Sequence, residues 1–318
     1  MADLTVRVLR KKQEAEGIAS FELVREGGGP LPAFSAGSHI DVHVPGGATR
    51  QYSLCNDPVL RNVYRIAVLR DAASRGGSVA MHDQVHEGDL LTISEPRNHF
   101  PLVHAVRTLL FAGGIGITPL LCMAQRLAAV GADFELHYCT RSQARTAFVD
   151  EIAASPFAAR VHYHFDDGPP EQKLDLAQLL PQVETQTHLY VCGPAGFIHH
   201  VTEWARSHGW PAQQIHVEFF AGAAQDTAGD RPFEVKIAST GQVVTVPADQ
   251  TVVKALAAHG IEILTSCEQG VCGTCITRVL EGECDHRDLY FTDEEKARND
   301  QFTPCCSRAR SARLVLDL

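Results

Sequence analysis

The feature that most constrains this chain is a group of three cysteines near its C-terminal end. Cys267, Cys272 and Cys275 follow the spacing C-x4-C-x2-C within the stretch S-C-E-Q-G-V-C-G-T-C. This spacing is typical of plant-type [2Fe–2S] centres, in which iron is bound by cysteine thiolates. Gly270 and Gly273 would let the backbone fold closely and point N–H groups at the sulfurs. The stretch therefore predicts an iron–sulfur loop.

A [2Fe–2S] cluster needs a fourth thiolate, and two downstream positions could supply it. Cys284 lies nine residues past Cys275 in an acidic stretch, where negative charge would disfavour a reduced cluster. The pair Cys305-Cys306 follows a proline and precedes the strand-like run R-L-V-L-D-L, which could anchor Cys305 in a core. We therefore expect Cys305 to be the fourth ligand.

Two other interpretations of the cysteines fit less well. A disulfide framework is unusual in a chain without a secretion signal. Structural zinc sites usually combine two C-x2-C units, and this chain has one. Most of the other cysteines are expected to be buried free thiols, since they lie among apolar residues; they are Cys55, Cys122, Cys139, Cys192, Cys284 and Cys306.

Length and composition describe a globular protein with more than one domain. The 318 residues are 45% hydrophobic and 21% charged, which allows two or three domains with separate cores. The net charge of −10 argues against nucleic acid as a partner, because phosphate binding needs a basic surface. No apolar segment follows Met1, and no run of about 18 apolar residues occurs. We therefore expect a cytoplasmic protein that does not bind a membrane.

Residues 1–104 are predicted to form a small antiparallel β-barrel. Six β-rich runs alternate with turn signals such as G-G-G-P, P-G-G and E-G-D; the runs are T-V-R-V-L, I-A-S-F-E-L-V, H-I-D-V-H-V, Q-Y-S-L, Y-R-I-A-V-L and L-L-T-I-S. Two segments carry residues suited to a ligand. Arg50–Ser53 places a cation, an aromatic ring and a hydroxyl on one strand, and Arg75–Ser78 could form an anion-binding turn.

Residues 105–225 alternate β-rich and helical segments, which predicts a parallel sheet. An apolar run at 108–112 leads directly into G-G-I-G-I-T-P and then into an apolar helix that stops at Gly131. Strand, glycine turn and helix form the context of a phosphate-binding loop, although Pro119 replaces the third glycine of G-x-G-x-x-G. We expect this proline at helix position N1. Further strands are expected at 134–139, 159–165 and 187–192, and helices around 146–154, 174–180 and 194–208.

Two strands of this region end in residues that could contact a ligand. Thr140–Ser142 follows one strand, and Cys192–Pro194 ends another with a glycine turn before a helix. Open α/β sheets bind their ligands at the carboxyl ends of the strands. Both segments are therefore candidate binding residues.

Residues 226–318 are predicted to form a compact α+β domain of the β-grasp type. A small, polar segment at about 222–231 is interpreted as a linker. A hairpin at 233–246, a helix at 251–259 and the cysteine loop follow it. The segment Glu281–Glu295 holds seven acidic residues and one arginine, a charge that suits either docking of a basic surface or solubility.

In this order, the motifs resemble the phthalate dioxygenase reductase family, particularly its vanillate O-demethylase reductase type, over essentially the whole chain. The matching motifs are R-Q-Y-S-L-C-N, R-G-G-S, G-G-I-G-I-T-P, C-G-P, C-E-Q-G-V-C-G-T-C, D-H-R-D and C-C-S-R-A. The resemblance implies a reductase that passes electrons from NADH through FMN and a [2Fe–2S] cluster to a Rieske non-haem iron oxygenase. It also implies a flavin-binding antiparallel β-barrel, an α/β Rossmann-like NAD domain and a C-terminal β-grasp ferredoxin domain.

The resemblance also implies a role for each motif. Arg50 and the Arg75–Ser78 turn would hold the FMN phosphate, Tyr52 and Ser53 would contact the flavin, and Cys192 would lie beside the nicotinamide. The implied cofactor-binding residues are Arg50, Gln51, Tyr52, Ser53, Arg75, Gly76, Gly77, Ser78, Gly113, Gly114, Gly116, Thr118, Pro119, Thr140, Arg141, Ser142, Cys192, Gly193 and Pro194. The implied catalytic residues are Ser53, Cys192 and Phe220, and the implied iron ligands are Cys267, Cys272, Cys275 and Cys305.

Three alternatives stay open at this point. Arg141 and Ser142 stand where an acidic residue would bind the ribose and reject a 2′-phosphate, so NADPH is an alternative to NADH. A stand-alone NAD(P)H flavin reductase could use a cytochrome or a small molecule as its acceptor, although such an enzyme has no need of a ferredoxin domain. An electron-transfer module without NADH chemistry would need neither the glycine loop nor Cys192.

Overall fold

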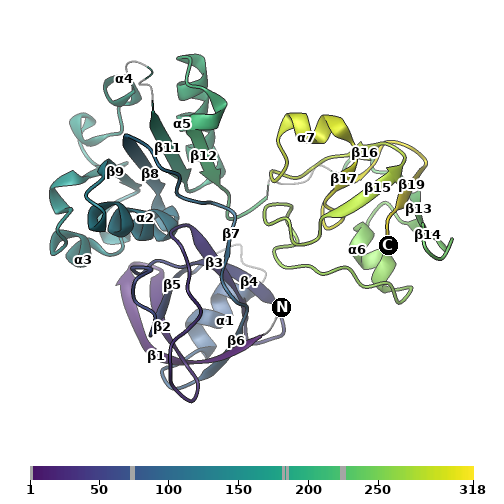
Figure 1. Cartoon of the computed structure of the whole chain (residues 1–318), viewed down its shortest axis with the longest axis horizontal. Helices are drawn as coiled ribbons and strands as arrows, with labels where there is room; N and C mark the ends of the chain where they lie inside the picture. Colours follow the sequence, from purple (N-terminus) through teal and green to yellow (C-terminus); the bar gives the residue numbers. More distant parts are fainter. Residues whose placement is uncertain (1–2, 72–75, 181–182, 184–185, 223–226) are drawn as a thin grey trace. The chain divides into compact units, whose positions relative to one another are not determined.

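The chain forms two compact units, an N-terminal unit of residues 1–218 and a C-terminal unit of residues 219–318 (Figure 1). The computed structural model describes residues 3–71, 76–180, 183, 186–222 and 227–318. None of the helices within these ranges has both the length and the apolar character that crossing a membrane requires.

An antiparallel sheet of seven strands makes up the first half of the N-terminal unit. Its strands run in the order β4-β3-β6-β1-β2-β5, and β7 pairs with β3. Alternating side chains of these strands, among them Phe21, Ile40 and Tyr64, fill an apolar core. The six predicted strands are confirmed, whereas a helix at 77–84 was not predicted. The elements are β1 (Leu4–Ala15), β2 (Ile18–Arg25), β3 (Ser38–His43), β4 (Thr49–Ser53), β5 (Tyr64–Leu69), α1 (Gly77–Gln84), β6 (Leu90–Ile93) and β7 (Arg97–Asn98).

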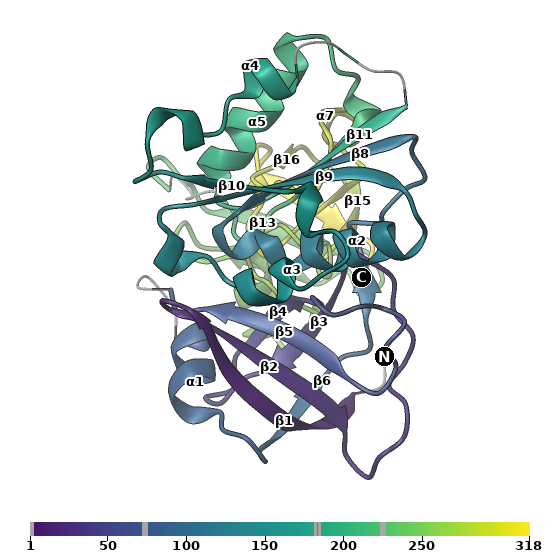
Figure 2. The ribbon, with the colours of Figure 1, turned by 90° about the vertical axis from the view of Figure 1, so that its left-hand side faces the viewer.

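A parallel sheet in the order β10-β9-β8-β11-β12 makes up the second half of this unit. One face of this sheet carries Leu110 and Tyr138 and packs on α2 and on residues of the antiparallel sheet such as Ile18. Helix α5 covers the opposite face (Figure 2). The predicted strands and helices are present, whereas β12 was not predicted. The elements are β8 (Arg107–Gly113), α2 (Ile117–Ala129), β9 (Asp133–Thr140), α3 (Val149–Ala153), β10 (Val161–Phe165), α4 (Leu176–Leu179), β11 (Thr187–Cys192), α5 (Ala195–Ser207) and β12 (Ile215–Glu218).

The glycine loop leads into its helix earlier than predicted. A short 3-10 turn at Gly114–Gly116 precedes α2, which begins at Ile117. Pro119 is therefore the third helical residue, and the predicted N1 position is wrong by two residues. A proline is tolerated there because the N–H groups of the first turn have no acceptor within the helix.

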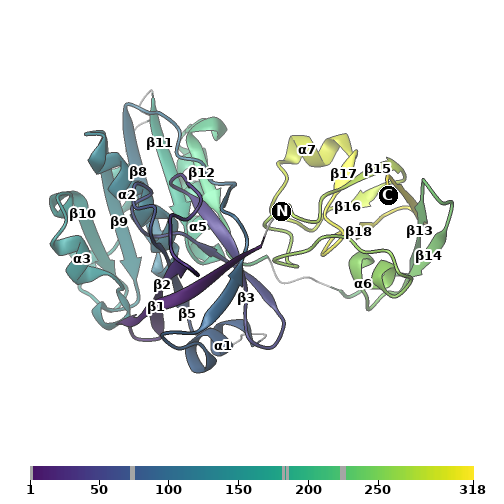
Figure 3. The ribbon, with the colours of Figure 1, turned by 60° about the horizontal axis from the view of Figure 1, so that its bottom comes forward.

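The C-terminal unit is a five-stranded sheet in the order β14-β13-β19-β15-β17, with a separate β16-β18 pair. Helix α6 lies beside β14, and α7 lies beside β17 (Figure 3). The core contains Val235, Leu256 and Phe302. The predicted hairpin, helix and final strand are present, whereas β15 to β18 and α7 were not predicted. The elements are β13 (Phe233–Ile237), β14 (Val243–Val246), α6 (Val252–Ala257), β15 (Thr277–Glu281), β16 (Cys284–Asp285), α7 (Asp293–Arg298), β17 (Gln301–Phe302), β18 (Arg308–Ala309) and β19 (Arg313–Leu316).

The predicted order of an antiparallel β region, a parallel α/β sheet and a small α+β unit is confirmed; the region predicted as a β-barrel is a seven-stranded antiparallel sheet with β4 and β5 at the ends of its strand order. The two regions predicted at 1–104 and 105–225 lie within one compact unit as far as residue 218. The boundary between these two regions stays a sequence prediction.

Candidate active site and metal centre

Strand β4 and the start of α1 bring two predicted phosphate-binding segments together. The Arg50 side chain packs on Gly77 so closely that a Cβ atom at Gly77 would lie 2.6 Å from Arg50 Nε. Gly76 caps α1 with a φ of 97°, a conformation that suits glycine. A guanidinium therefore lies at the N-terminal end of a helix, where backbone N–H groups favour an anion. Arg75 lies outside the described residues.

The remaining predicted residues of these segments differ in their surroundings. Tyr52 is two residues from Arg50 on β4 and therefore shares its face. Burial raises the pKa of the Tyr52 phenol, and Arg50 acts in the opposite direction. Gln51 points to the other face and contacts His39 at 3.3 Å. In the first turn of α1, the Ser78 hydroxyl accepts a hydrogen bond from the backbone N–H of residue 71 at 3.2 Å.

The glycine loop after β8 packs directly against the turn after β11. A Cβ atom at Gly116 would lie 2.2 Å from the carbonyl oxygen of Cys192, and one at Gly113 would lie 3.0 Å from Pro194 Cδ. Only glycine allows these backbones to approach so closely. The contacts leave the N-terminus of α2 at the carboxyl end of the sheet, where such folds bind phosphate groups. The other predicted residues here are Gly114, Thr118 and Pro119 around the start of α2 and Gly193 before α5.

The ends of β9 and β10 bring two acidic residues beside the predicted ribose site. The backbone N–H of Asp166 donates to the carbonyl of Thr140 at 3.0 Å, and that of Asp167 donates to the carbonyl of Arg141 at 3.1 Å. The Thr140 hydroxyl donates to the carbonyl of Ser142 at 3.1 Å. Asp166 and Asp167 were not singled out from the sequence, although the pair D-D directly follows a predicted strand.

A hydroxyl, a carboxyl and a thiol meet where the two sheets of the N-terminal unit approach each other. Ser53, at the end of β4, donates a hydrogen bond to Glu218 Oε2 at 3.2 Å. Glu218 ends β12 and is paired in register with Cys192 at the end of β11. Ser53 is 5% exposed and Cys192 is fully buried.

Burial gives this group unusual protonation properties. It raises the pKa of Glu218 to about 8, while the hydrogen bond from Ser53 acts in the opposite direction. Burial, followed by the neighbouring Glu218, raises the pKa of the Cys192 thiol. Glu218 can therefore gain or lose a proton near neutral pH, which is a property of groups that work in proton transfer.

Sequence patterns predicted Ser53 and Cys192 but missed Glu218. The carboxyl is recognisable only once β12 is identified, because its place beside Cys192 comes from the pairing of β11 with β12. Phe220 belongs to the C-terminal unit and its side chain is 39% exposed. Its catalytic role stays a prediction.

In the C-terminal unit, the loop after α6 and the turn after β17 bring four thiols together. Cys267 makes side-chain contacts with Cys272 and Cys305, and Cys305 also contacts Cys275. Hydrogen bonds from Cys272 and Cys305 lower the pKa of the Cys267 thiol. The backbone N–H of Gln269 also donates to Cys267 Sγ at 3.3 Å. The loop therefore points both thiols and N–H groups toward one place.

Tight turns at two glycines allow this convergence. Gly270 and Gly273 both have a φ of 72°, and a Cβ atom at Gly273 would lie 2.5 Å from the ring of Tyr290. Cys284 is elsewhere, in the apolar core with Val279. Burial raises the pKa of the Cys284 thiol to about 11. The surroundings of Cys284 are therefore those of a packed thiol.

The contacts between the four thiols are pairwise. Cys267 contacts Cys272, Cys275 contacts Cys305, and the contact between Cys267 and Cys305 joins the two pairs. The four cysteines predicted as iron ligands are therefore neighbours in the structure, and their role as ligands stays a prediction.

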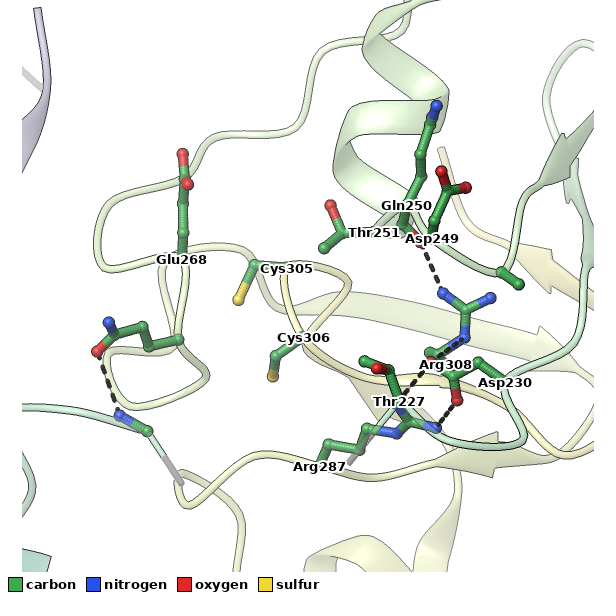
Figure 4. A pocket seen from close by; sticks show the side chains of 13 residues that line it. Thr227, Asp230, Asp249, Gln250, Thr251, Glu268, Arg287, Cys305, Cys306 and Arg308 are labelled. Atoms are coloured by element: carbon green, nitrogen blue, oxygen red, sulfur yellow. Dashed lines mark hydrogen bonds and ion pairs between the residues drawn. The ribbon is translucent and has the colours of Figure 1, made fainter. Parts of the chain in front are cut away.

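A cavity of about 690 Å³ opens beside this centre (Figure 4). Cys305 and Cys306 line it together with Asp230, Arg287 and Arg308. Asp230 accepts hydrogen bonds from Arg287, and Arg308 donates to the carbonyl of Gln250 at 2.6 Å. Asp230, in the segment predicted as a linker, is thus held by hydrogen bonds to Arg287 of the C-terminal unit.

Comparisons with known proteins show to which family the chain belongs. The family model described as a 2Fe-2S iron-sulfur cluster binding domain matches residues 235–310. A vanillate O-demethylase oxidoreductase from a Pseudomonas species (strain HR199) is 59% identical over 305 residues, which cover 96% of each chain. The solved structure of a phthalate dioxygenase reductase, described as a modular structure for electron transfer from pyridine nucleotides to [2Fe-2S], is 40% identical with a TM-score of 0.78. The match covers 100% of this chain and 98% of that one.

The chain belongs to the phthalate dioxygenase reductase family. The predicted resemblance is thereby confirmed, as is the predicted activity of an oxidoreductase in the electron-transfer chain of an oxygenase system. The same fold also occurs as part of a longer chain. An intact type IV self-sufficient cytochrome P450 monooxygenase is 40% identical to 99% of this chain, with a TM-score of 0.87, and the match covers 41% of that longer chain.

Proposed function

We propose that the chain takes electrons from NADH, holds FMN in its N-terminal unit and a [2Fe–2S] cluster in its C-terminal unit, and delivers electrons to a Rieske oxygenase. The observation that carries the proposal is the meeting of Ser53, Glu218 and Cys192, which joins the antiparallel sheet to the carboxyl end of the parallel sheet. A flavin would supply the conversion between hydride and single-electron chemistry.

Arg50 and the N-terminus of α1 would hold the FMN phosphate. The fit rests on the close packing of the guanidinium on Gly77 and on the helix N–H groups that follow Gly76. A side chain at position 77 would fill this space, since its Cβ would overlap Arg50. Tyr52, on the same face of β4 as Arg50, would pack on the flavin ring.

The glycine loop would hold the pyrophosphate of the nicotinamide dinucleotide, and the ends of β9 and β10 would hold its adenosine ribose. Asp166 and Asp167 lie beside Thr140 and Arg141 through backbone hydrogen bonds. A carboxylate near the ribose accepts hydrogen bonds from its hydroxyls and repels a 2′-phosphate. The two aspartates therefore favour NADH over NADPH, a choice that Arg141 and Ser142 alone leave open.

Ser53 and Glu218 would handle the proton that accompanies reduction. A carboxyl whose pKa is about 8 holds its proton at neutral pH. Its Oε2 lies 3.2 Å from the Ser53 hydroxyl, which can pass a proton in either direction. Cys192, beside Glu218, would line the place of the nicotinamide ring.

Cys267, Cys272, Cys275 and Cys305 would hold the cluster. The thiols converge in two pairs, and cluster ligation would use their deprotonated forms. The cluster would supply one-electron storage between the flavin and the acceptor.

The acceptor would bind where acidic charge is available. Within the acidic segment, Glu283 and Asp285 lie near Arg310, and Asp285 also pairs with Arg287. Asp293 and Glu294, in the first turn of α7, are exposed. The acidic surface available to an acceptor is therefore smaller than the seven acidic residues of the segment suggest.

The proposal is tested by purifying the full chain and titrating it with NADH without oxygen. Flavin and iron–sulfur absorption should bleach together, acid-released flavin should be FMN, and NADPH should act at least about tenfold less efficiently. A chain that retains FMN but no iron and sulfide would contradict the iron–sulfur part. The variant Asp167→Ser should narrow the difference between NADH and NADPH, with Asp150→Ser on α3 as the control.

A further inference from the structure

The motif D-H-R-D at residues 285–288 lies between the two segments that carry the cysteines. On one side, Asp288 packs on Gly270 of the cysteine loop, and the N–H of Leu289, directly after the motif, donates to the carbonyl of Gly270 at 3.0 Å. On the other side, the N–H of Arg287 donates to the hydroxyl of Ser307 at 3.1 Å, two residues after Cys305. The motif therefore touches both ligand-bearing segments.

Asp288 is the member of this motif that makes contacts in both directions. Its carboxylate accepts hydrogen bonds from the N–H groups of Tyr290 and Phe291 at 3.2 and 2.9 Å, and from the Ser307 hydroxyl at 3.4 Å. A Cβ atom at Gly270 would lie 2.9 Å from Asp288 Cβ, so the aspartate packs directly on the cysteine loop. Its side chain has no exposed surface.

The carboxylate of Asp288 has a histidine beside it, whereas Lys296 bonds to the backbone of Asp288 and not to its carboxylate. His286 lies on the same carboxylate at 3.4 Å, and Lys296 donates to the backbone carbonyl of Asp288 at 2.8 Å. Charges buried in a protein are screened less than those at its surface. A fixed negative charge here opposes the addition of an electron to a centre held by Cys305 and the cysteine loop.

We propose that Asp288 is a positioning residue of the iron–sulfur centre. It joins the Cys267–Cys275 loop to the Cys305 turn through Ser307, and its charge lowers the reduction potential of the cluster. The inference rests on the proposed function, because it assigns the cluster to these four cysteines. It adds a role for a motif that lies outside the ligand set.

Two variants of the full chain separate the two parts of this role. Asp288→Asn removes the charge but keeps a group that can bond to Ser307 and to the backbone N–H groups. Ser307→Ala removes the bond to the Cys305 turn and keeps the charge. Asp293→Asn, on the exposed first turn of α7, serves as the control for a general change in charge.

The measurements are iron and sulfide per chain, the rate of cluster loss to a chelator, and the midpoint potential from a redox titration followed by electron paramagnetic resonance. Asp288→Asn should favour the reduced cluster by about tenfold, which is about 59 mV for one electron. Ser307→Ala should lose its cluster several-fold faster with little change in potential. Asp293→Asn should do neither.

The outcomes distinguish this inference from the proposed function. A wild-type chain without a cluster overturns both. A wild-type cluster whose potential is the same in Asp288→Asn, or moves equally in Asp293→Asn, overturns the inference alone. If Asp288→Asn takes up no cluster, Ser307→Ala decides: faster loss supports the bracing role, and an unchanged rate contradicts it.

Discussion

Glu218 is a half-buried residue beside Cys192, whereas Asp288 is fully buried beside the cysteine loop, and the two carboxyl groups differ in the number of hydrogen bonds that they accept. Glu218 accepts a hydrogen bond from Ser53, and burial raises its pKa to about 8. Asp288 accepts hydrogen bonds from two backbone N–H groups and from Ser307. A sparsely bonded carboxyl can exchange a proton near neutral pH, whereas one with several donors serves as an anchor.

Replacing Gly270 by alanine should have the largest effect, because it disrupts the packing of Asp288 on the cysteine loop. The new Cβ would lie 2.4 Å from Cys306 Sγ and 2.9 Å from Asp288 Cβ, at a φ of +72°. We expect iron and sulfide to fall to roughly a tenth of the wild-type content, with the flavin retained.

The matched control is Gly260→Ala. Gly260 has a φ of +77°, and a Cβ atom added there would meet no other atom within 4 Å, so alanine introduces backbone strain without a collision. Its cost should be about 1 kcal/mol of unfolding free energy, with the cluster kept. Equal loss of iron in both variants would show that strain, not contact with Asp288, is responsible.

Glu218→Gln should have the next largest effect, because it removes the exchangeable proton. We expect the rate of flavin reduction by saturating NADH to fall about tenfold to a hundredfold, as is typical for the loss of a general acid or base. Anaerobic stopped-flow absorbance measures this rate. Glu203→Gln, on the exposed face of α5, should leave it unchanged.

The same variant should change how stability depends on pH. Between pH 4.5 and about 8, unfolded Glu218 has lost its proton while the folded group keeps it. The unfolding free energy therefore falls as pH rises through this window, by at most about 5 kcal/mol. Urea unfolding of both proteins at pH 5, 6.5 and 8 measures this dependence. The unfolding free energy of the wild type should fall relative to that of Glu218→Gln as pH rises. Parallel profiles would contradict the raised pKa.

Ser53→Ala should have the smallest effect and sharpens the comparison. Its hydrogen bond lowers the pKa of Glu218, so its removal should raise that pKa further. If flavin reduction needs the protonated carboxyl, its rate falls as pH rises through the pKa of Glu218. The pH at which the rate falls should therefore move upward by less than about one unit. A downward shift would show that Ser53 does not stabilise the ionised carboxyl.

Local patterns predicted those parts of both sites that depend on neighbouring residues. The cysteine spacing indicated three thiols that the loop does bring together, and the glycine loop lies where strand, turn and helix meet. Glu218 and Asp288 were missed as functional residues for the same reason. Glu218 meets Ser53 from 165 positions away, and Asp288 bonds to Ser307 from 19 positions away in addition to its local bonds from Tyr290 and Phe291.

By itself, the sequence determined the type of each layer, the order of the motifs and the cluster-type cysteine loop, because periodicity, turn residues and ligand spacing act over a few residues. The sequence also favoured Cys305 over Cys284, and the structure brings Cys305 to the loop while Cys284 lies in the apolar core. Only the tertiary structure decided that Glu218 stands beside Cys192 and that Asp288 bridges two segments. The physical reason is that burial and hydrogen bonding depend on which distant strands pair, and strand pairing is a property of the whole fold.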